Sequence, residues 1–268
     1  MTTTVVSPRA VITSPRRLDW RVLDDHDFDT PQQGMARDAE LGVEVANGGP
    51  PTFRLWVSPQ SLAISRQDTR LPGFADAAEV MAATGWPVIV RETGGSAVPL
   101  GPGVLNLSLV MPRSLLVGHP GTSLELVYEL LCKPIRQTLS TLNIHSIFGS
   151  VPGAFCDGRF NLVVNGKKIS GTAQVWRGSR AGRAANGDGF VLAQAALLVD
   201  VDAQAVTETA NRFYRLAGKP MQFASTDIVS VRECVGWRDR PGTPASGLVD
   251  RVREMIFNYC ELGAGKIA

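Results

Sequence analysis

Cys156 is the residue of this sequence whose type and surroundings most suggest chemistry. It lies in a loop that contains Pro152, Gly153 and Gly158, with Arg159 close by. A nearby cation and an irregular backbone lower the pKa of a thiol and leave its sulfur accessible. For an isolated cysteine an inert thiol is nevertheless the more common outcome, because reactivity needs a specific microenvironment. The loop alone therefore leaves both interpretations open.

The segment after this loop predicts a β-hairpin with one polar side. Asn165-Gly166 is the strongest short-range signal for a two-residue turn between strands. With these residues in the turn, Val164 lies opposite Lys167, and Asn161 lies opposite Ser170. The two-residue period of a strand then places polar side chains on one face: Lys168, Ser170, Thr172 and Gln174. A half-solvated strand has the same pattern, so it is the alternative to a reactive surface.

A glycine-rich segment supplies a third candidate. Arg91 ends a predicted strand and is followed by Gly94, Gly95 and Ser96. Adjacent glycines let a backbone approach a ligand closely and expose its N–H groups, and a fixed guanidinium suits a carboxylate or phosphate. The spacing is neither that of a P-loop nor that of a dinucleotide-binding fingerprint. The alternative is a plain connection between strands, with Arg91 in a surface ion pair.

Composition limits the classes of protein that can carry these residues. The chain has 268 residues, 44% of them hydrophobic, and its 27 Lys+Arg against 25 Asp+Glu give a net charge of +2. Collagen-like, coiled-coil and wholly disordered proteins are excluded, and nucleic acid is not an expected partner. No run approaches the roughly 18 apolar residues of a membrane span, and the N-terminus lacks the pattern of a cleavable leader. We therefore expect a soluble, cytoplasmic protein with no membrane partner.

The cysteines and histidines predict no metal site. No two cysteines have the C-x-x-C spacing of a zinc ribbon or a redox pair, so each is expected to be a free thiol: Cys132, Cys156, Cys234 and Cys260. Cys132 falls on an apolar helix face, which favours a buried and inert thiol. The histidines are too scattered to indicate a catalytic triad: His26, His119 and His145.

Hydrophobic periodicity places these segments on helices and strands. Spacings of three and four residues predict helices at 33–46, 74–84, 123–142, 203–216 and 247–259, the third kinked or divided by Pro134. Strand patterns lie at 53–57, 61–65, 87–91 and 104–111, and a run at 189–201 that is apolar on both faces fits a central strand. This mixture predicts an α+β (mixed α/β) fold. We expect a disordered tail at 1–17 and a single domain at 18–268.

Two of these segments resemble the signatures of the lipoate-protein ligase and octanoyltransferase family. They are Arg91-Glu92-Thr93-Gly94-Gly95-Ser96-Ala97-Val98 and the stretch 164–174, VNGKKISGTAQ. Asn106 in VLNLSL and the closing strand GFVLAQAALLVDVD also fit, so the resemblance covers roughly residues 33–201. It implies a mixed sheet flanked by helices, related to the catalytic domain of biotin protein ligases. It also implies a tunnel for a C8 acyl chain, with Lys168 holding the acyl carbonyl.

Within that family the sequence is most similar to the cysteine-dependent octanoyl amidotransferases. The likeness lies in residues 65–73, 104–109 and 152–160, where Cys156 matches the acyl-accepting thiol. The resemblance implies that Cys156 and Lys168 are catalytic. It implies substrate contacts for a further set of residues, of which Gly94, Gly95 and Ser96 would wall the chain end of the ligand: Arg91, Gly94, Gly95, Ser96, Asn106, Asn161, Ser170 and Gly171.

The same resemblance implies the partners. They are an octanoylated or lipoylated carrier, either acyl carrier protein or glycine-cleavage H protein, and the lipoyl domains of 2-oxoacid dehydrogenases. The amidotransferases move octanoyl from the H protein to those other lipoyl domains, with no cofactor.

Two other functions remain open. ATP-dependent ligases for lipoate or biotin need ATP and Mg²⁺, and where they carry an acid after G-R-x this chain has Asn161, which is poorly suited to hold Mg²⁺. Where many family members carry a Tyr-His or Phe-His pair, this chain has Pro99-Leu100. Both departures favour acyl transfer over ligation. The second alternative is a non-catalytic acyl-binding protein.

The proposed chemistry requires Cys156 and Lys168 to meet. A straight hairpin would separate them by about 23 Å at roughly 3.3 Å per residue. The chain must therefore turn sharply, and Gly158 is the residue best able to adopt the necessary backbone angles. We expect the Cys156 loop to fold over the end of the strand, so that the sulfur and the Lys168 amine line one pocket beside Gly94 and Gly95.

Overall fold

The computed structural model describes residues 20–25, 28–116, 123–178, 189–236 and 247–264. The predicted tail at 1–17 lies outside the described residues, as do His26 and His119. None of the described helices is long and apolar enough to span a membrane.

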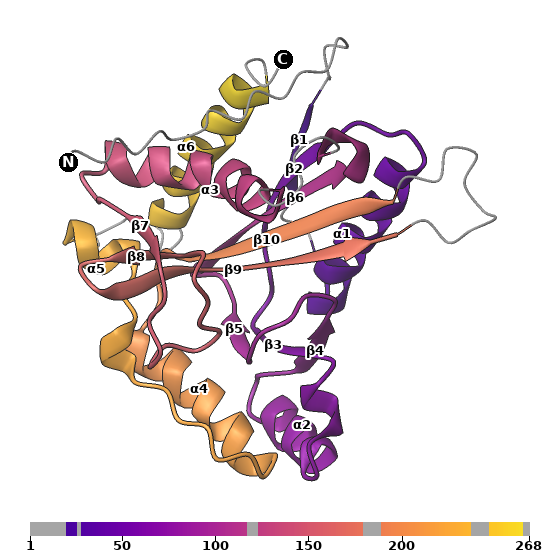
Figure 1. Cartoon of the computed structure of the whole chain (residues 1–268). Coiled ribbons are helices and arrows are strands. Elements are labelled where there is room, and N and C mark those ends of the chain that lie inside the picture. Colours follow the sequence, from indigo (N-terminus) through magenta and orange to yellow (C-terminus); the bar gives the residue numbers. More distant parts are fainter. Residues whose placement is uncertain (1–19, 26–27, 117–122, 179–188, 237–246, 265–268) are drawn as a thin grey trace, which may run out of the picture.

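A seven-stranded mixed sheet runs through the middle of the molecule (Figure 1). In spatial order its strands are β1 (Arg21–Asp25), β2 (Thr52–Val57), β6 (Val104–Pro112), β10 (Phe190–Leu198), β9 (Lys167–Arg177), β8 (Asn161–Val164) and β7 (Ile147–Gly149). β1 is parallel to β2, and the other neighbouring pairs are antiparallel. β10 is the central strand and is covered on both faces, which explains its nearly continuous apolar sequence.

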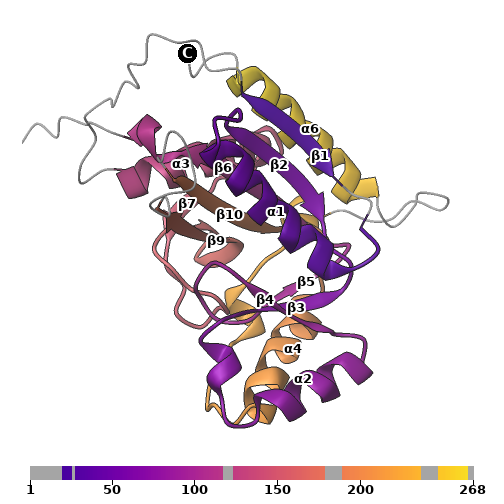
Figure 2. The ribbon, with the colours of Figure 1, turned by 90° about the vertical axis from the view of Figure 1, so that its right-hand side faces the viewer.

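A second sheet of three strands lies on one side of the first. Its order is β4 (Val88–Arg91), β3 (Ser61–Ser65) and β5 (Val98–Leu100). The helices are α1 (Pro31–Ala46), α2 (Phe74–Ala83), α3 (Ser123–Thr141), α4 (Ala203–Leu216), α5 (Val231–Val235) and α6 (Gly247–Ala264). α3 and α6 cover one face of the large sheet, whereas α1, the small sheet, α2 and α4 lie on the other (Figures 1 and 2).

Strand β6 shows how the sequence separates these two faces. Leu105, Leu107 and Leu109 enter the apolar core under α3 and α6. Asn106 and Ser108 alternate with them and are buried on the other face, toward the small sheet. Buried polar side chains on a strand this close to the centre of a sheet need partners or a ligand, so this face is the one on which a site is expected.

Most of the predicted elements are present, and the α+β class is confirmed. The short elements β1, β5, β7 and α5 were not predicted from the sequence. α3 continues across Pro134, so of the two expected outcomes, a kink or a division, the division does not occur. Proline removes one backbone hydrogen bond from a helix, but α3 packs against both α6 and the large sheet, and tertiary packing supplies most of the stability of a helix.

The hairpin turns at Asn165-Gly166 as predicted, but the predicted register is wrong after Lys168. A β-bulge makes Ile169 an extra residue, so Ser170 lies opposite Leu162 rather than opposite Asn161. The reason is packing, because Leu162 and Ile169 both belong to the apolar core. The polar face expected at alternate positions from Lys168 onward is therefore wrong: Lys168 lies on the cavity side of the sheet, and Ser170 pairs with core residues.

Candidate active site

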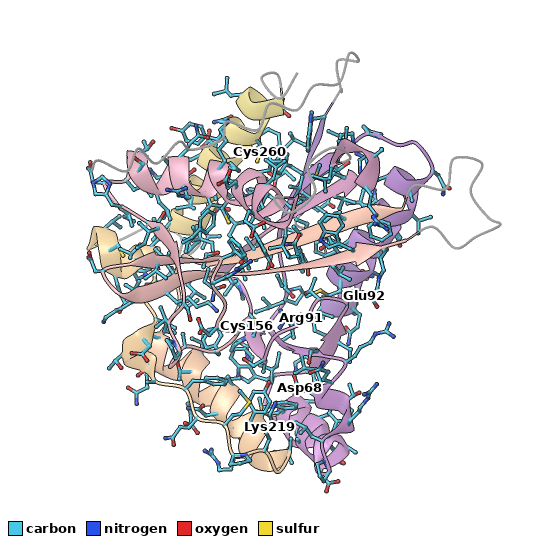
Figure 3. All side chains as sticks on the ribbon, in the orientation of Figure 1. Asp68, Arg91, Glu92, Cys156, Lys219 and Cys260 are labelled. Carbon is cyan, nitrogen blue, oxygen red and sulfur yellow. The ribbon has the colours of Figure 1, made fainter. Side chains whose placement is uncertain are left out.

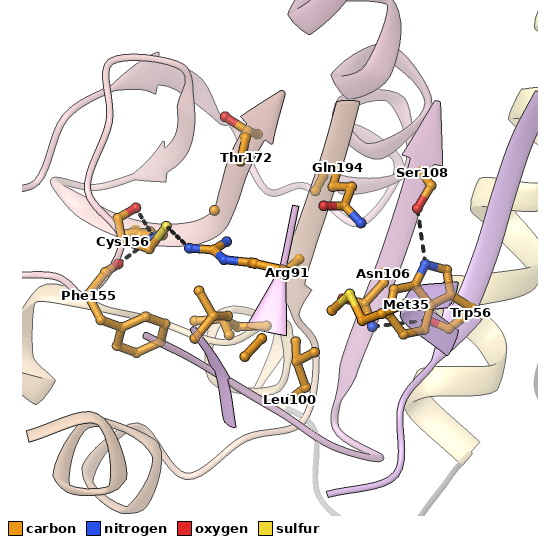
Figure 4. Close-up of a pocket in the computed structure, with 18 residues that line it drawn as sticks. Met35, Trp56, Arg91, Leu100, Asn106, Ser108, Phe155, Cys156, Thr172 and Gln194 are labelled. Atoms are coloured by element: carbon orange, nitrogen blue, oxygen red, sulfur yellow. Dashed lines mark hydrogen bonds between the residues drawn. The ribbon is translucent and has the colours of Figure 1, made fainter. Parts of the chain in front are cut away.

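Cys156 and Lys168 line one buried cavity between the two sheets (Figure 4). The cavity has a volume of about 40 Å³. Cys156, Lys168 and Arg91 line one part of it, and the remaining wall is largely apolar: Met35, Trp56, Ala63, Val98, Leu100, Phe155, Ala196 and Leu198. A few polar groups beside an apolar wall suit a ligand with a polar head and a hydrocarbon chain.

The loop that carries Cys156 is folded back at Cys156 itself. The φ angle of Cys156 is 49°, in the left-handed region, whereas Gly158 has no positive φ, so Cys156 and not Gly158 adopts the unusual backbone angles expected in this loop. Asp157 fixes the loop by accepting a hydrogen bond from the Val151 N–H at 2.7 Å. The Cys156 N–H donates to Ser96 Oγ at 2.6 Å. These bonds hold the sulfur against the glycine-rich segment.

Lys168 holds the carbonyl side of the same loop. Its Nζ donates to the carbonyl oxygens of Phe155 at 2.6 Å and of Cys156 at 2.7 Å. Gly171 makes room for this amine, since a Cβ at Gly171 would lie only 2.9 Å from Nζ. Burial lowers the pKa of Lys168 to about 8. An ammonium has three N–H donors, so one remains available to a ligand in the cavity.

Arg91, rather than Arg159, is the guanidinium beside the thiol. Its Nη2 lies 3.4 Å from Cys156 Sγ and donates to the Ser96 carbonyl at 2.8 Å. Burial by itself raises the pKa of the Cys156 thiol, but the charges of Arg91 and then Lys168 outweigh it, so the pKa is lowered. The surface ion pair considered for Arg91 is not formed with any carboxylate of the described residues, and Arg91 is only 8% exposed.

The glycine-rich segment packs behind the sulfur. Gly95 has a φ of 102°, and a Cβ at this position would clash with Cys156 Sγ. Ser96 binds the Cys156 N–H, whereas a Cβ on Gly94 would have no neighbour within 4 Å. None of the three lines the cavity. The structure therefore places Gly95 and Ser96 beside the thiol.

Asn161 is fully buried and connects the Cys156 loop to β9. Its Nδ2 donates to the Cys156 carbonyl at 3.1 Å, and its Oδ1 accepts from the Thr172 N–H at 2.9 Å. This pairing needs a donor and an acceptor on one side chain, which an amide offers and a carboxylate does not. Ser170 lies outside the cavity, with its hydroxyl donating to the Ala196 carbonyl at 3.1 Å. Of the predicted ligand contacts, Arg91, Asn106 and Gly171 line the cavity.

Tyr214 and Asp68 support the glycine-rich segment, and neither was expected from the sequence. The Tyr214 hydroxyl, on α4, accepts from the Ala97 N–H at 2.7 Å and donates to Asp68 at 3.2 Å. Burial raises the pKa of Tyr214, so this hydroxyl keeps the proton that it donates. Ala97 directly follows Ser96, and the contact therefore anchors the segment behind the thiol. Tyr214 was hidden because its spacing on an amphipathic helix is that of an ordinary core residue.

A network of buried polar side chains fixes the other part of the cavity wall. Of its members, only Asn106 was expected from the sequence. Asn106 Nδ2 donates to the Trp56 carbonyl at 3.3 Å, and the Trp56 indole donates to the Ser108 hydroxyl at 3.1 Å. Asp38 of α1 accepts hydrogen bonds of 2.6 Å from each of three side chains: Arg54, Ser108 and Gln194. In the view of Figure 4, Trp56 and Asn106 lie away from Cys156. The cavity thus has two fixed polar supports.

Residues 30–237 match the family model described as the lipoyl protein ligase A/B catalytic domain. The chain belongs to this family. An octanoyl-GcvH:protein N-octanoyltransferase of Kyrpidia tusciae is 43% identical over 196 residues, which are 73% of this chain and 66% of that protein. The match thus spans just under two thirds of that relative. A relative of the same name from Geobacillus kaustophilus is 31% identical over 220 residues, which are 80% of this chain and 73% of the relative.

Solved structures agree with the family at the level of the fold. A T. acidophilum protein solved with bound lipoic acid superimposes with a TM-score of 0.60 at 18% identity, covering 89% of this chain and 82% of that one. The expectation of a ligase-like catalytic domain, with a mixed sheet flanked by helices, is therefore confirmed. Within this lipoyl ligase fold the described residues contain no group of three or more His, Cys, Asp or Glu placed to hold a metal ion.

Proposed function

We propose that this chain is an acyltransferase that moves an octanoyl group onto the lysine of a lipoyl domain through a thioester on Cys156. One observation carries the proposal: a thiol of lowered pKa lies with Lys168 in a cavity whose remaining wall is largely apolar. The names of the two relatives, which describe an N-octanoyltransferase that uses octanoyl-GcvH, support the choice of acyl group and of a protein donor.

In the first half-reaction the Cys156 thiolate attacks the octanoyl carbonyl on the donor. The new C–S bond forms as the bond from the carbonyl to the donor lysine nitrogen breaks, and the leaving amine takes up a proton. Lys168 is suited to this step, because its third N–H can donate to the carbonyl oxygen on which negative charge develops. With a pKa of about 8 it can also release a proton near neutral pH.

In the second half-reaction the lysine amine of the acceptor attacks the thioester. An amide bond forms, the C–S bond breaks, and the electron pair returns to Cys156 as a thiolate that Arg91 and Lys168 stabilise. The attacking nitrogen loses a proton in this step, and Lys168 in its neutral form can accept it. A covalent intermediate thus divides one difficult transfer between two amines into two easier steps.

The ATP-dependent ligase remains the alternative, and the residues favour it less. Mg²⁺ prefers carboxylate oxygens and phosphate, and the described residues that line the cavity include no Asp or Glu. Asn161 has both amide atoms engaged within the protein. The glycine-cleavage H protein is the donor that we propose, with octanoyl-acyl carrier protein as the alternative donor and lipoyl domains as acceptors.

Intact-mass spectrometry without ATP tests the proposal. The protein is incubated separately with octanoylated H protein and with octanoyl-acyl carrier protein, and we expect a gain of one octanoyl group that peptide mapping locates on Cys156. Addition of an apo lipoyl domain should then discharge the adduct and acylate that domain. The donor that charges Cys156 faster identifies the carrier.

The other outcomes decide against the transferase. Transfer that requires ATP, with octanoic acid or lipoic acid as the substrate, would identify a ligase. Saturable binding of octanoate with no covalent adduct and no transfer under either condition would identify a non-catalytic acyl-binding protein.

A further inference from the structure

Met35 of α1 lies where the cavity meets a second space. On the outer side of Met35 a surface groove of about 250 Å³ runs between α1, β4 and β10. Three side chains line both the cavity and this groove: Met35, Arg91 and Gln194. These side chains are therefore the partition between the two spaces. In the view of Figure 4, Met35 lies beside Trp56 and Asn106, away from Cys156.

Two of the three partition residues are held by hydrogen bonds. Arg91 is bound to the Ser96 carbonyl and to the Cys156 sulfur. The Gln194 amide donates to Asp38 at 2.6 Å, and its oxygen accepts from Thr93 at 3.0 Å. Met35 has no polar atom of this kind and an unbranched side chain that changes rotamer readily. It is therefore the movable part of the partition.

The groove beyond Met35 can receive hydrocarbon. Its lining includes the apolar residues Ala36, Ala39, Ile89, Val90 and Leu192, and Val90 is 46% exposed. Two carboxylates also line it, and both are engaged: Asp38 by three side-chain donors, and Glu92 by Arg66 and Arg177. A chain that passes Met35 would thus meet apolar surface.

We propose that Met35 closes the distal end of the acyl cavity and sets the longest acyl chain that Cys156 accepts. The inference rests on the proposed acyltransferase function. A volume of about 40 Å³ holds only about three water-sized spheres of roughly 10–15 Å³ each, so an eight-carbon chain requires a side chain to move. Movement of Met35 joins the cavity to the groove and supplies that space without breaking a hydrogen bond.

The test is a chain-length profile of the acyl-enzyme. Wild-type protein, Met35→Ala and Met35→Phe are each incubated with hexanoyl, octanoyl, decanoyl and dodecanoyl thioesters of N-acetylcysteamine, and the rate of adduct formation on Cys156 is measured by intact mass. One methylene in an apolar pocket changes selectivity by about tenfold or more. We therefore expect Met35→Ala to raise the decanoyl-to-octanoyl ratio by about tenfold, and Met35→Phe to lower the octanoyl-to-hexanoyl ratio by a similar factor.

Met221→Ala is the matched control, because Met221 is also half-buried but lines neither the cavity nor the groove. An unchanged profile in both Met35 variants, or an equal change in Met221→Ala, would overturn the inference while leaving the acyl-enzyme in place. If the wild type forms no adduct either with these thioesters or with the octanoylated carrier proteins, the proposed function itself fails. Binding of free octanoate, decanoate and dodecanoate, followed by calorimetry, then decides whether Met35 limits chain length.

Discussion

The two faces of the large sheet bury thiols in opposite electrostatic surroundings. Under α3 and α6, Cys132 and Cys260 are enclosed by apolar side chains, and burial raises the pKa of each thiol to about 12. On the other face Cys156 is only 6% exposed, yet its thiol pKa is lowered because Arg91 and Lys168 lie beside it. Figure 3 shows Cys260 and Cys156 on the two sides of the sheet. Burial alone therefore does not decide the reactivity of a thiol, and the neighbouring cations do.

The face that carries Cys156, the reactive face, makes a demand on the fold that the face under α3 and α6, the core face, does not make. The core face needs only close packing of apolar side chains. The reactive face, in contrast, buries two cations, Arg91 and Lys168, close together. Arg91 Nε has no hydrogen-bond partner among the described residues, and the pKa of Lys168 is lowered because burial disfavours its charge. Such groups are retained against a desolvation penalty, which is expected at a functional site and not in a structural core.

Substitution of the two thiols gives the largest expected contrast. Cys156→Ser should abolish the octanoyl adduct and the transfer, because an un-ionised hydroxyl is a far weaker nucleophile than a thiolate. Intact mass and a lipoyl-domain acylation assay measure both. Cys132→Ser is the matched control and should retain transfer. Normal turnover in Cys156→Ser, with an unchanged Tm, would mean that no acyl-enzyme forms on this residue.

Removal of the Lys168 charge should have the next largest effect. Lys168→Met keeps the length of the side chain but has no donor for the acyl carbonyl and no proton to exchange, so kcat/KM should fall by about 10²–10⁴-fold. Transfer kinetics measure the loss, and circular dichroism checks that the fold is kept. Lys167→Met is the control, since Lys167 neighbours Lys168 in the sequence but is exposed. A loss below tenfold would remove Lys168 from the chemistry.

The Arg91 charge should be visible in the pH dependence of thiol alkylation. Iodoacetamide reacts with the thiolate, so the rate at Cys156 falls as the pH decreases through its lowered pKa. Arg91→Gln removes the cation that contributes most to that lowering, and the midpoint should move to higher pH. Cys132, with a thiol pKa of about 12, should not react in the same range. An unmoved midpoint in Arg91→Gln would assign the effect to Lys168 alone.

The difference between the two faces also explains which structural features could be predicted from the sequence. Periodic elements such as α1, α3 and α4 were identified because their apolar faces are continuous, and Cys132 was correctly placed on the apolar face of α3. The register after Lys168 failed because a bulge depends on packing between Leu162 and Ile169 rather than on a local signal. β5 was missed because it is three residues long and contains Pro99.

The reactive face was less predictable because its contacts join distant parts of the chain. Arg91 meets Cys156 across 65 residues, and Tyr214 meets Ala97 across 117. No periodic pattern encodes such a contact. Only the likeness of whole segments to a known family placed Cys156 and Lys168 together, whereas the nearness of Arg159 in the sequence suggested the wrong guanidinium beside the thiol.

On the core face, Cys132→Ser should affect stability and not chemistry. The variant places a hydroxyl in a fully buried apolar site, where an unsatisfied polar group costs about 1–3 kcal/mol. Urea unfolding measures the free energy of unfolding, and the transfer assay should give the wild-type rate. Cys234→Ser, at a partly exposed position, serves as the control and should change stability by less. A loss of transfer without a loss of stability would contradict the assignment of the two faces.

The smallest expected effect comes from Tyr214, which supports the reactive face without lining the cavity. Tyr214→Phe removes the acceptor for the buried Ala97 N–H, and Ala97 adjoins Ser96, which in turn binds both the Cys156 N–H and Arg91. We expect a several-fold fall in kcat with little change in KM, and a higher pH midpoint for Cys156 alkylation because Arg91 is held less firmly. Tyr259→Phe, which removes a hydroxyl bonded to Thr141 between α3 and α6, is the control from the other face. If both variants lower stability equally and neither moves the alkylation midpoint, Tyr214 is an ordinary structural tyrosine, and the electrostatics of the thiol depend only on the groups that touch it.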